Sequence, residues 1–244
     1  MPPKFENFYN DPARPVPTNT FNADYQLAVD SAAQRVFDYF SNSNEQSIMI
    51  QYPDIWSIRE QLETISSFIV PHLEKTMYGC YLYVDKIYVY RTTKCERDSS
   101  YIWHYDNNPN EIVKNIIYLN GVDEDNSPFE YLSKPDGRGY MFNSYRSGPD
   151  HWHKAPNGSR ANKEVEKLSE SGHKPVRITG PKGTTFTFNN NTCHRANPII
   201  EGYRDVINIR VKPTLNRIDF ISKKNTTSFE KSGVVDPNPE SIYE

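Results

Sequence analysis

The feature that most constrains the fold is a change of pattern after Gly79. From there on, short segments rich in β-branched and aromatic residues alternate with turn residues, mostly without helical patterns between them. Strands at this spacing indicate a sandwich or barrel. The composition agrees, because 17 Tyr and 12 Phe accompany only 36% hydrophobic residues, which suits sheets with one face in water. Strands are predicted within YLYVDKIYVYRTT, SYIWHYD, KNIIYLNGV, FEYLSKP, VRITGPKGTTFTFNN and RDVINIRVKP.

Two amphipathic helices are predicted before these strands. From Asp24 to Phe40, apolar residues recur at intervals of three and four, which predicts one helix with a single apolar face. In the next helix, Ser57 and Glu60 form a capping-box pattern ahead of an apolar stripe. Pro71 is expected to kink or end that second helix. Both stripes predict packing against a sheet rather than a cofactor role.

The rest of the chain predicts one domain with two polar ends. The length suits a single β domain, which we place at residues 23–221. Residues 1–22 are rich in Pro and aperiodic, which predicts an extended or disordered arm. Residues 222–244 are polar and predict a tail with little order.

An insertion at residues 134–176 interrupts the strands with Gly, Pro and charged residues. A short helix is expected there from Ser159 to Ser171, ended by Gly172. Long insertions in compact β folds are usually lids or binding loops. The motif HWH could chelate a metal, but no third ligand is evident nearby, so a place in the lid is the favoured interpretation. The candidate residues for contact with a substrate are Arg146, His151 and His153.

Charge and cysteine content exclude several classes of protein. The net charge of −3 and the pI near 6.1 give no general attraction to nucleic acid or to an anionic membrane. The three cysteines form neither a CxxC pair nor an even framework, so a thiolate zinc site and a disulfide scaffold are not expected. No segment resembles a signal peptide or approaches the ~20 apolar residues of a membrane span. These observations predict a cytoplasmic protein.

The motif HYD places His104 and Asp106 two residues apart in a predicted strand, where both side chains point to the same face. Alone, such a pair is common on protein surfaces. A third ligand, His194, ends a later predicted strand. Two histidines and one carboxylate on neighbouring strands form a facial triad with three open positions, which is typical of non-heme Fe(II) oxygenases.

Arg204 follows His194 by ten residues, across a turn that contains Pro198 and Gly202. A guanidinium can bind a carboxylate through two parallel hydrogen bonds, so Arg204 suits the distal end of a keto-diacid that chelates the iron. Arg195 is beside the ligand histidine and should face away. Arg210 shares the strand parity of Arg204 and is the alternative anchor.

These residues resemble the Fe(II)- and 2-oxoglutarate-dependent dioxygenase superfamily, most closely its prolyl 4-hydroxylase-like branch and more distantly the phytanoyl-CoA hydroxylase group. Three blocks carry the resemblance: HYDNNPNEIVKNIIYLN, GTTFTFNNNTCHRANP and HRANPIIEGYR. It covers roughly residues 80–215. The resemblance implies a mainly β fold, a cupin-like jelly roll (double-stranded β-helix) flanked by the N-terminal α-helices.

The resemblance also implies how the site works. The triad would bind Fe(II), and Arg204 would anchor the distal carboxylate of 2-oxoglutarate. The hydroxyl groups of Tyr118 and Tyr90 would point to this cosubstrate, although tyrosines in sheets also pack with backbone partners. O₂ would be consumed, succinate and CO₂ released, and a C–H bond hydroxylated, with ascorbate as an additional cofactor in some members. The carboxylate of Asp106 favours hydroxylation over halogenation, because related halogenases have a small residue there.

Two departures and two rival classes remain open. DNSPFEYL stands where the family often has a Gly-Gly or NGPL turn, which affects the pocket wall at Phe129, and the insertion is longer than usual. The rivals are a jelly-roll module that binds a metal or sugar without turnover, and a cupin metalloenzyme that does not use 2-oxoglutarate. The substrate class stays open between an amino acid, a peptidyl side chain and a small organic acid, because loops select it.

Overall fold

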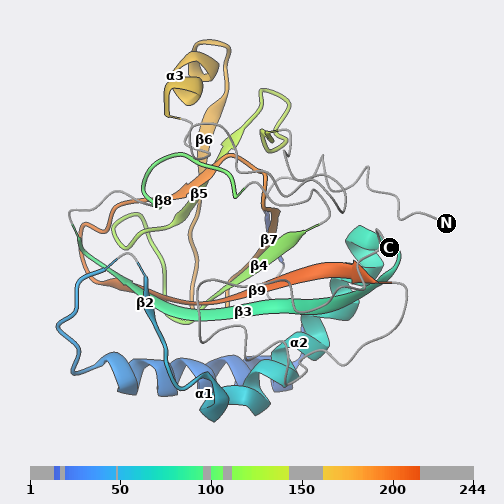
Figure 1. Cartoon of the computed structure of the whole chain (residues 1–244), viewed down its shortest axis with the longest axis vertical. Helices are drawn as coiled ribbons and strands as arrows, with labels where there is room; N and C mark the ends of the chain where they lie inside the picture. The colour runs from blue at the N-terminus through green and yellow to red at the C-terminus, as the bar shows by residue number, and fades with distance from the viewer. Residues whose placement is uncertain are drawn as a thin grey trace.

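A computed structural model describes the central part of the chain, which is mainly antiparallel β with a few helices (Figure 1). Within the described ranges, none of the helices has the length and hydrophobicity that crossing a bilayer requires. The described residues are 14–16, 20–47, 49–95, 100–106, 112–142 and 162–214.

The strands form two sheets. The larger one has the order β1-β7-β4-β9-β3-β2 and the smaller one the order β6-β5-β8, with antiparallel pairing throughout. The long predicted strand at residues 81–93 is confirmed residue for residue. The six strands of the larger sheet are β1 (Arg14–Pro15), β2 (Ile50–Gln51), β3 (Tyr81–Thr93), β4 (Val113–Tyr118), β7 (Thr185–Asn189) and β9 (Tyr203–Thr214). The smaller sheet contains β5 (Phe129–Ser133), β6 (Lys174–Ile178) and β8 (His194–Ala196).

Helices α1 (Ala23–Phe40) and α2 (Arg59–Leu73) cover one face of the larger sheet (Figure 1). The side chain of Asn22 caps α1 by accepting hydrogen bonds from two backbone N–H groups of its first turn. The predicted apolar stripe of α2 is confirmed, and that of α1 is confirmed in part: both helices form one core with the strands beneath them, but the apolar side chains of Leu27 and Phe37 in α1 are exposed. This core includes Val29, Val36, Ile65, Ile69, Ile87, Ile117, Ile207 and Ile209.

The second helix departs from the sequence pattern at its start. A 3₁₀ turn, Ile55–Ile58, precedes α2, and the Ser57 hydroxyl donates to a backbone carbonyl three residues earlier, so the predicted capping box is wrong. The prediction for Pro71 is confirmed, since the α-helix α2 ends two residues later at Leu73. A π-helical turn, Glu74–Tyr78, follows it directly. Proline has no N–H to offer the preceding turn, which favours this change.

The other face of the larger sheet packs against the smaller sheet. A second apolar cluster fills the space between them, with residues from β3, β4, β5, β6, β7 and β9. Aromatic rings are prominent in it, and Phe129 and Phe186 lie with ring centroids 5.1 Å apart. The functional candidates lie along this inner space, on the side of the sheet away from α1 and α2.

The segment that carries His104 is not the strand that was predicted. Residues 100–106 contain a turn and a single bridge, in which His104 and His194 exchange backbone hydrogen bonds of 3.0 and 2.9 Å. The next bond runs from the N–H of Asp106 to the carbonyl of Asn190, out of register with that pair. A turn at Asn190 therefore ends the ladder after one residue pair.

The described end of the insertion packs on the smaller sheet. Helix α3 (Asn162–Glu170) lies far from α1 and α2 (Figure 1), and Val165 joins a small core with Trp103 and Leu132. Gly172 follows the helix with a φ of 87°, as expected for a residue that ends it. The lid candidates Arg146, His151 and His153 lie outside the described residues, as does the predicted start of this helix.

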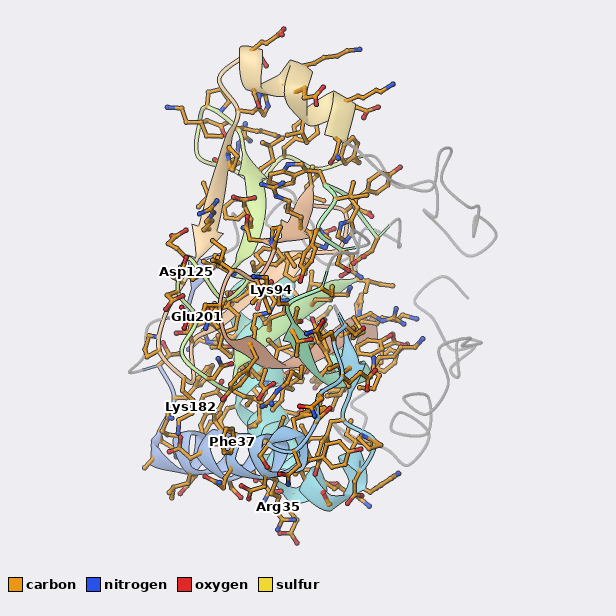
Figure 2. All side chains as sticks on the ribbon, turned by 90° about the vertical axis from the view of Figure 1, so that its left-hand side faces the viewer. Arg35, Phe37, Lys94, Asp125, Lys182 and Glu201 are labelled. Carbon is orange, nitrogen blue, oxygen red and sulfur yellow. The ribbon has the colours of Figure 1, made fainter. Side chains whose placement is uncertain are left out.

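The loop that leads into β9 is held by backbone contacts. The N–H groups of Ile200 and Glu201 donate to the carbonyl of Asp125 at 2.7 and 3.2 Å. The Lys94 ammonium donates to the Ile200 carbonyl at 3.4 Å. Lys94, Asp125 and Glu201 accordingly lie together on one side of the molecule (Figure 2). These contacts fix the start of β9, the strand that carries Arg204.

A buried ion pair joins β3 to β9 on the side of the helices. Arg91 donates two hydrogen bonds to the carboxylate of Asp205, at 2.7 and 2.6 Å, and its guanidinium lies over the rings of Phe40 and Tyr203, 4.9 and 3.9 Å from their centroids. Burial raises the pKa of Asp205, while Arg91 opposes this shift. Removing only one partner of this pair should therefore destabilise the protein, because the other charge stays buried without compensation.

We expect Arg91→Met to reduce the free energy of unfolding at pH 7 by about 3–5 kcal/mol, because the carboxylate of Asp205 stays buried without its partner. The raised pKa means that folded Asp205 binds protons more readily than the unfolded chain does. Stability should therefore recover as the pH falls from 7 to 5. Urea denaturation at both pH values tests this, with Arg59→Met at the exposed pair with Glu63 as the control. An equally small loss in both variants would contradict the prediction.

Candidate metal centre

The structure brings His104, Asp106 and His194 together. One potential ligand atom from each side chain lies within 4.8 Å of the other two, and the two imidazole centroids are 4.4 Å apart. The single bridge between residues 100–106 and β8 positions both histidines, and Asp106 follows two residues later. The three side chains that the sequence predicts as a triad thus converge on one position in the structure.

Backbone carbonyls orient both imidazoles. Nδ1 of His104 lies 2.7 Å from the carbonyl of Ile102, and Nδ1 of His194 lies 2.7 Å from the carbonyl of Thr192. Because a carbonyl only accepts, each Nδ1 carries the proton and each Nε2 presents a lone pair. This arrangement is typical of histidines that bind a metal.

The local electrostatics keep His194 and Asp106 in the forms that can bind a metal. Burial, together with the nearby His104 and Lys114, lowers the pKa of His194 to about 3, so its imidazole is neutral. Burial alone would raise the pKa of Asp106, but Lys114 and the two histidines outweigh it and hold this pKa well below its usual range. The Lys114 ammonium lies 2.6 Å from Oδ2 of Asp106, which leaves Oδ1 available.

The donor set fits a divalent transition metal. Two neutral imidazoles and one carboxylate suit such ions, whose ligand bonds of about 2.0–2.2 Å would draw the three groups closer. The cluster opens on a cavity of about 150 Å³. Phe129 and Phe188 line it and contact the His194 ring, with centroids 5.4 and 4.9 Å away. The cluster could therefore hold a metal ion with an apolar wall beside it.

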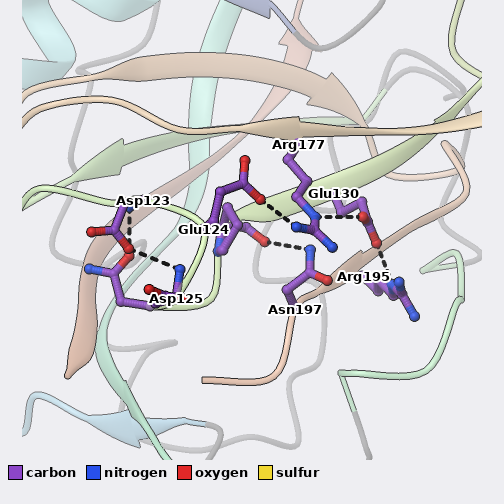
Figure 3. Close-up of polar contacts among 9 residues, drawn as sticks. Asp123, Glu124, Asp125, Glu130, Arg177, Arg195 and Asn197 are labelled. Atoms are coloured by element: carbon purple, nitrogen blue, oxygen red, sulfur yellow. Dashed lines mark hydrogen bonds and ion pairs between the residues drawn. The ribbon is translucent and has the colours of Figure 1, made fainter. Parts of the chain in front are cut away.

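A charged network supports the strand that presents His194. The carboxylate of Glu130, which is 1% exposed, accepts from Arg177 at 3.0 Å and from Arg195 at 2.5 Å (Figure 3). The Arg195 guanidinium also lies 4.5 Å from the centroid of the Trp103 ring. Arg195 lines the cavity, although the sequence predicts that it faces away, and its guanidinium is paired with Glu130.

Arg204 lines the same cavity and is 5% exposed. Its Nη1 donates to the carbonyl of Ser127, and its Nε has no partner within the described part of the chain. The hydroxyl of Ser127 is likewise buried and unpaired there, and its backbone has a φ of 69°. Buried polar groups without partners are costly, so this corner of the cavity fits an anionic ligand.

Sequence reasoning missed Ser127. It belongs to DNSPFEYL, where the chain departs from the usual turn of the resembled family. That departure was the available signal in the sequence, since it showed that this turn is unusual. The structure shows why: Ser127 is a non-glycine residue with positive φ, which is uncommon and often marks a functional turn.

The two tyrosines differ in position. Tyr90 lines the cavity, whereas Tyr118 is not among the residues that line it. The Tyr118 hydroxyl donates to the carbonyl of Ile178 at 2.7 Å and accepts from the N–H of Phe129 at 3.1 Å. Burial raises the pKa of Tyr118 to about 12, against the effect of Arg204. Its arrangement is that of a packed aromatic with backbone partners, the alternative considered from the sequence.

No family model and no curated protein matches the chain by sequence. Its fold is shared with solved structures. HygX from Streptomyces hygroscopicus, with nickel and 2-oxoglutarate bound, is 15% identical with a TM-score of 0.52, over 94% of this chain and 93% of HygX. The epimerase SnoN, in complex with Fe3+, alpha ketoglutarate and nogalamycin RO, is 14% identical with a TM-score of 0.56, over 98% and 93%. EctD from S. alaskensis in its apoform is 15% identical with a TM-score of 0.53, over 92% and 84%.

Proposed function

We propose that the chain is a non-heme Fe(II)- and 2-oxoglutarate-dependent oxygenase. The observation that carries this proposal is the cluster of His104, Asp106 and His194 in one cavity with Arg204, whose buried Nε lacks a partner among the described residues. A site that only held a metal would not need a buried guanidinium beside it. The structures that share the fold support the proposal, because HygX and SnoN hold a metal together with 2-oxoglutarate.

The chain's own residues would have distinct roles. The two imidazoles would present Nε2, and Asp106 would present Oδ1, to the metal. Arg204 would bind the distal carboxylate of 2-oxoglutarate by charge-assisted hydrogen bonds. Phe129 and Phe188 would limit the access of water to the bound groups. The metal and 2-oxoglutarate would together activate O₂, with release of succinate and CO₂.

The finer assignments belong to the same proposal. We place the chain in the prolyl 4-hydroxylase-like branch, with hydroxylation of a C–H bond in a small-molecule or peptidyl substrate. We assign the two facing sheets to a double-stranded β-helix within one domain at residues 23–221. The packing of the two sheets against each other, with α1 and α2 covering the outer face of the larger sheet, supports this assignment. Tyr90 is proposed as the tyrosine nearer to the cosubstrate because it lines the cavity.

The proposal is tested by the formation of succinate. The purified full chain, loaded with Fe(II) without oxygen, is mixed with 2-oxoglutarate and O₂, alone and with panels of amino acids, peptides and small acids. We expect succinate in amounts that depend on Fe(II) and rise with a suitable substrate, whereas Asp106→Asn should give only the background level. If succinate formation by the wild-type protein equals that of Asp106→Asn, with metal and 2-oxoglutarate both bound, the proposal is contradicted.

Analysis of the product distinguishes hydroxylation from a second outcome, epimerisation or ring closure of the substrate. SnoN is an epimerase and SnoK, which shares the fold at 12% identity and a TM-score of 0.55, is a carbocyclase. A substrate that gains one oxygen atom supports hydroxylation. A substrate that changes configuration or loses hydrogen while succinate forms supports the second outcome.

A further inference from the structure

A row of basic residues crosses the inner face of the larger sheet. In the strand register, Lys114 of β4 lies opposite Arg210 of β9, which lies opposite Lys86 of β3. Lys212 follows on the same face of β9, two residues after Arg210. The row belongs to the cavity side of the sheet, because Lys114 lines the cavity and Asn208, two residues before Arg210, lines it as well.

Such a row of positive charges destabilises the sheet unless anions lie beside it. Like charges directly opposite each other in a sheet destabilise it. The structure partly offsets this cost with Asp85, which sits at a β-bulge, is fully buried and pairs with Arg210 and Lys212. Lys114 pairs instead with Asp106. If Asp106 also binds a divalent metal, the metal neutralises part of its charge, and Lys114 then becomes a source of positive potential beside the metal.

The amide of Asn208 is a second, independent sign of a ligand. This side chain is 6% exposed and lines the cavity, and its Oδ1 has no hydrogen-bond partner in the described residues. Ile116 of β4 lies opposite Asn208 of β9. Lys114, two residues before Ile116, is therefore the diagonal neighbour of Asn208 on the same face, at about 7–8 Å between Cα atoms. A buried acceptor of this kind is costly unless water or a bound molecule donates a hydrogen bond to it, so it marks a position suited to a ligand donor.

We propose that Lys114 and Asn208 form the subsite for a small-molecule substrate that carries an oxyanion, carboxylate or phosphate, with an O–H or N–H donor next to it. Lys114 has three N–H donors, of which one is used by Asp106, so the others can bind the oxyanion. The amide oxygen of Asn208 accepts from the substrate's donor group. This subsite therefore selects hydroxy acids, amino acids and the phosphate esters of diols or amino alcohols over neutral molecules.

The subsite is separate from the proposed cosubstrate anchor. Arg204 and Asn208 lie on the same face of β9, about 13 Å apart along the strand. Lys114 is on the next strand, beside Asp106. The metal cluster thus has a cationic group for 2-oxoglutarate on one side and a second one for the substrate. This inference rests on the proposed function only in requiring a metal and 2-oxoglutarate in the cavity.

The test measures binding of simple probes rather than turnover. The full chain is loaded with paramagnetic Co(II) and saturated with 2-oxoglutarate, and relaxation of acetate protons and of the phosphorus of inorganic phosphate is followed as each probe is titrated. We expect saturable enhancement with at least one probe, and about tenfold weaker binding in Lys114→Met. Lys114→Arg should retain the binding, and so should the surface control Lys182→Met. The probe that responds identifies carboxylate or phosphate as the oxyanion.

Asn208 is tested by comparing glycolate with acetate, since the two differ by one hydroxyl group. We expect glycolate to bind about two- to fivefold more tightly, and Asn208→Leu to abolish this difference. Equal probe binding in the wild type and Lys114→Met, or a glycolate preference that persists in Asn208→Leu, would overturn the proposed subsite. Failure to bind Co(II) or 2-oxoglutarate would instead contradict the proposed function, so the two failures are distinguishable.

Discussion

Replacement of His194 by alanine should abolish metal binding and, with it, the formation of succinate from 2-oxoglutarate. The remaining His104 and Asp106 come from one short segment and cannot provide the third side of the facial arrangement. Loss of a residue that merely orients a ligand costs about 10- to 100-fold in metal affinity, so the loss of a ligand should exceed about 100-fold. Anaerobic titration with Fe(II), or with Co(II) followed by its visible absorption, measures this affinity directly.

The matched control for this variant is His173→Ala. His173 follows α3, and its Nδ1 lies 3.1 Å from the carbonyl of Leu168, so it resembles the ligand histidines in its local bonding but not in its position. We expect metal affinity to be unchanged in this control. Because His194 is buried, circular dichroism and urea denaturation of His194→Ala must show a folded protein. A folded His194→Ala that binds metal as tightly as the wild type would contradict the triad.

The long central strands could be predicted because pattern and length agree over many residues. Strand β3 has thirteen residues of β-branched, aromatic and alternating character, and its partner β9 has twelve. The segment around His104 could not be assigned in the same way. The backbone pairing of His104 ends because the segment opposite it turns at Asn190. That segment lies far away in the sequence, so the turn cannot be seen from the residues around His104. Local composition therefore indicated a strand, although only one residue pair forms there.

The candidate site shows the same limit. The candidate metal ligands could be found because the chemistry of such a site restricts them to a few residue types at fixed offsets. Lys114 and Asn208 escaped notice because a lysine or asparagine in a strand usually faces water. Only the packing of the two sheets turns their side of the strand into a cavity wall. The pairing of Arg210 with Asp85 was hidden in a β-bulge, which shifts residue parity by one and cannot be seen from alternation.

Arg204→Met is expected to weaken 2-oxoglutarate binding by about 10- to 100-fold while leaving metal affinity unchanged, because it removes charge-assisted hydrogen bonds to the distal carboxylate. The affinity can be measured without a substrate, from the visible absorption that appears when Fe(II) is chelated by a keto acid. Arg195→Met is the matched control, since Arg195 also lines the cavity but pairs with Glu130.

Comparison with 2-oxobutyrate, which lacks the distal carboxylate, separates this role of Arg204 from a general change in the cavity. The wild-type protein should prefer 2-oxoglutarate strongly, and Arg204→Met should bind both keto acids with similar, low affinity. The ratio of the two affinities cancels any loosening that affects both ligands equally. If Arg204→Met kept the wild-type ratio, the distal carboxylate would have another partner. Arg210 shares the strand parity of Arg204 but pairs with Asp85 and is not among the residues that line the cavity, so Lys114, which lines it, would be the next residue to replace.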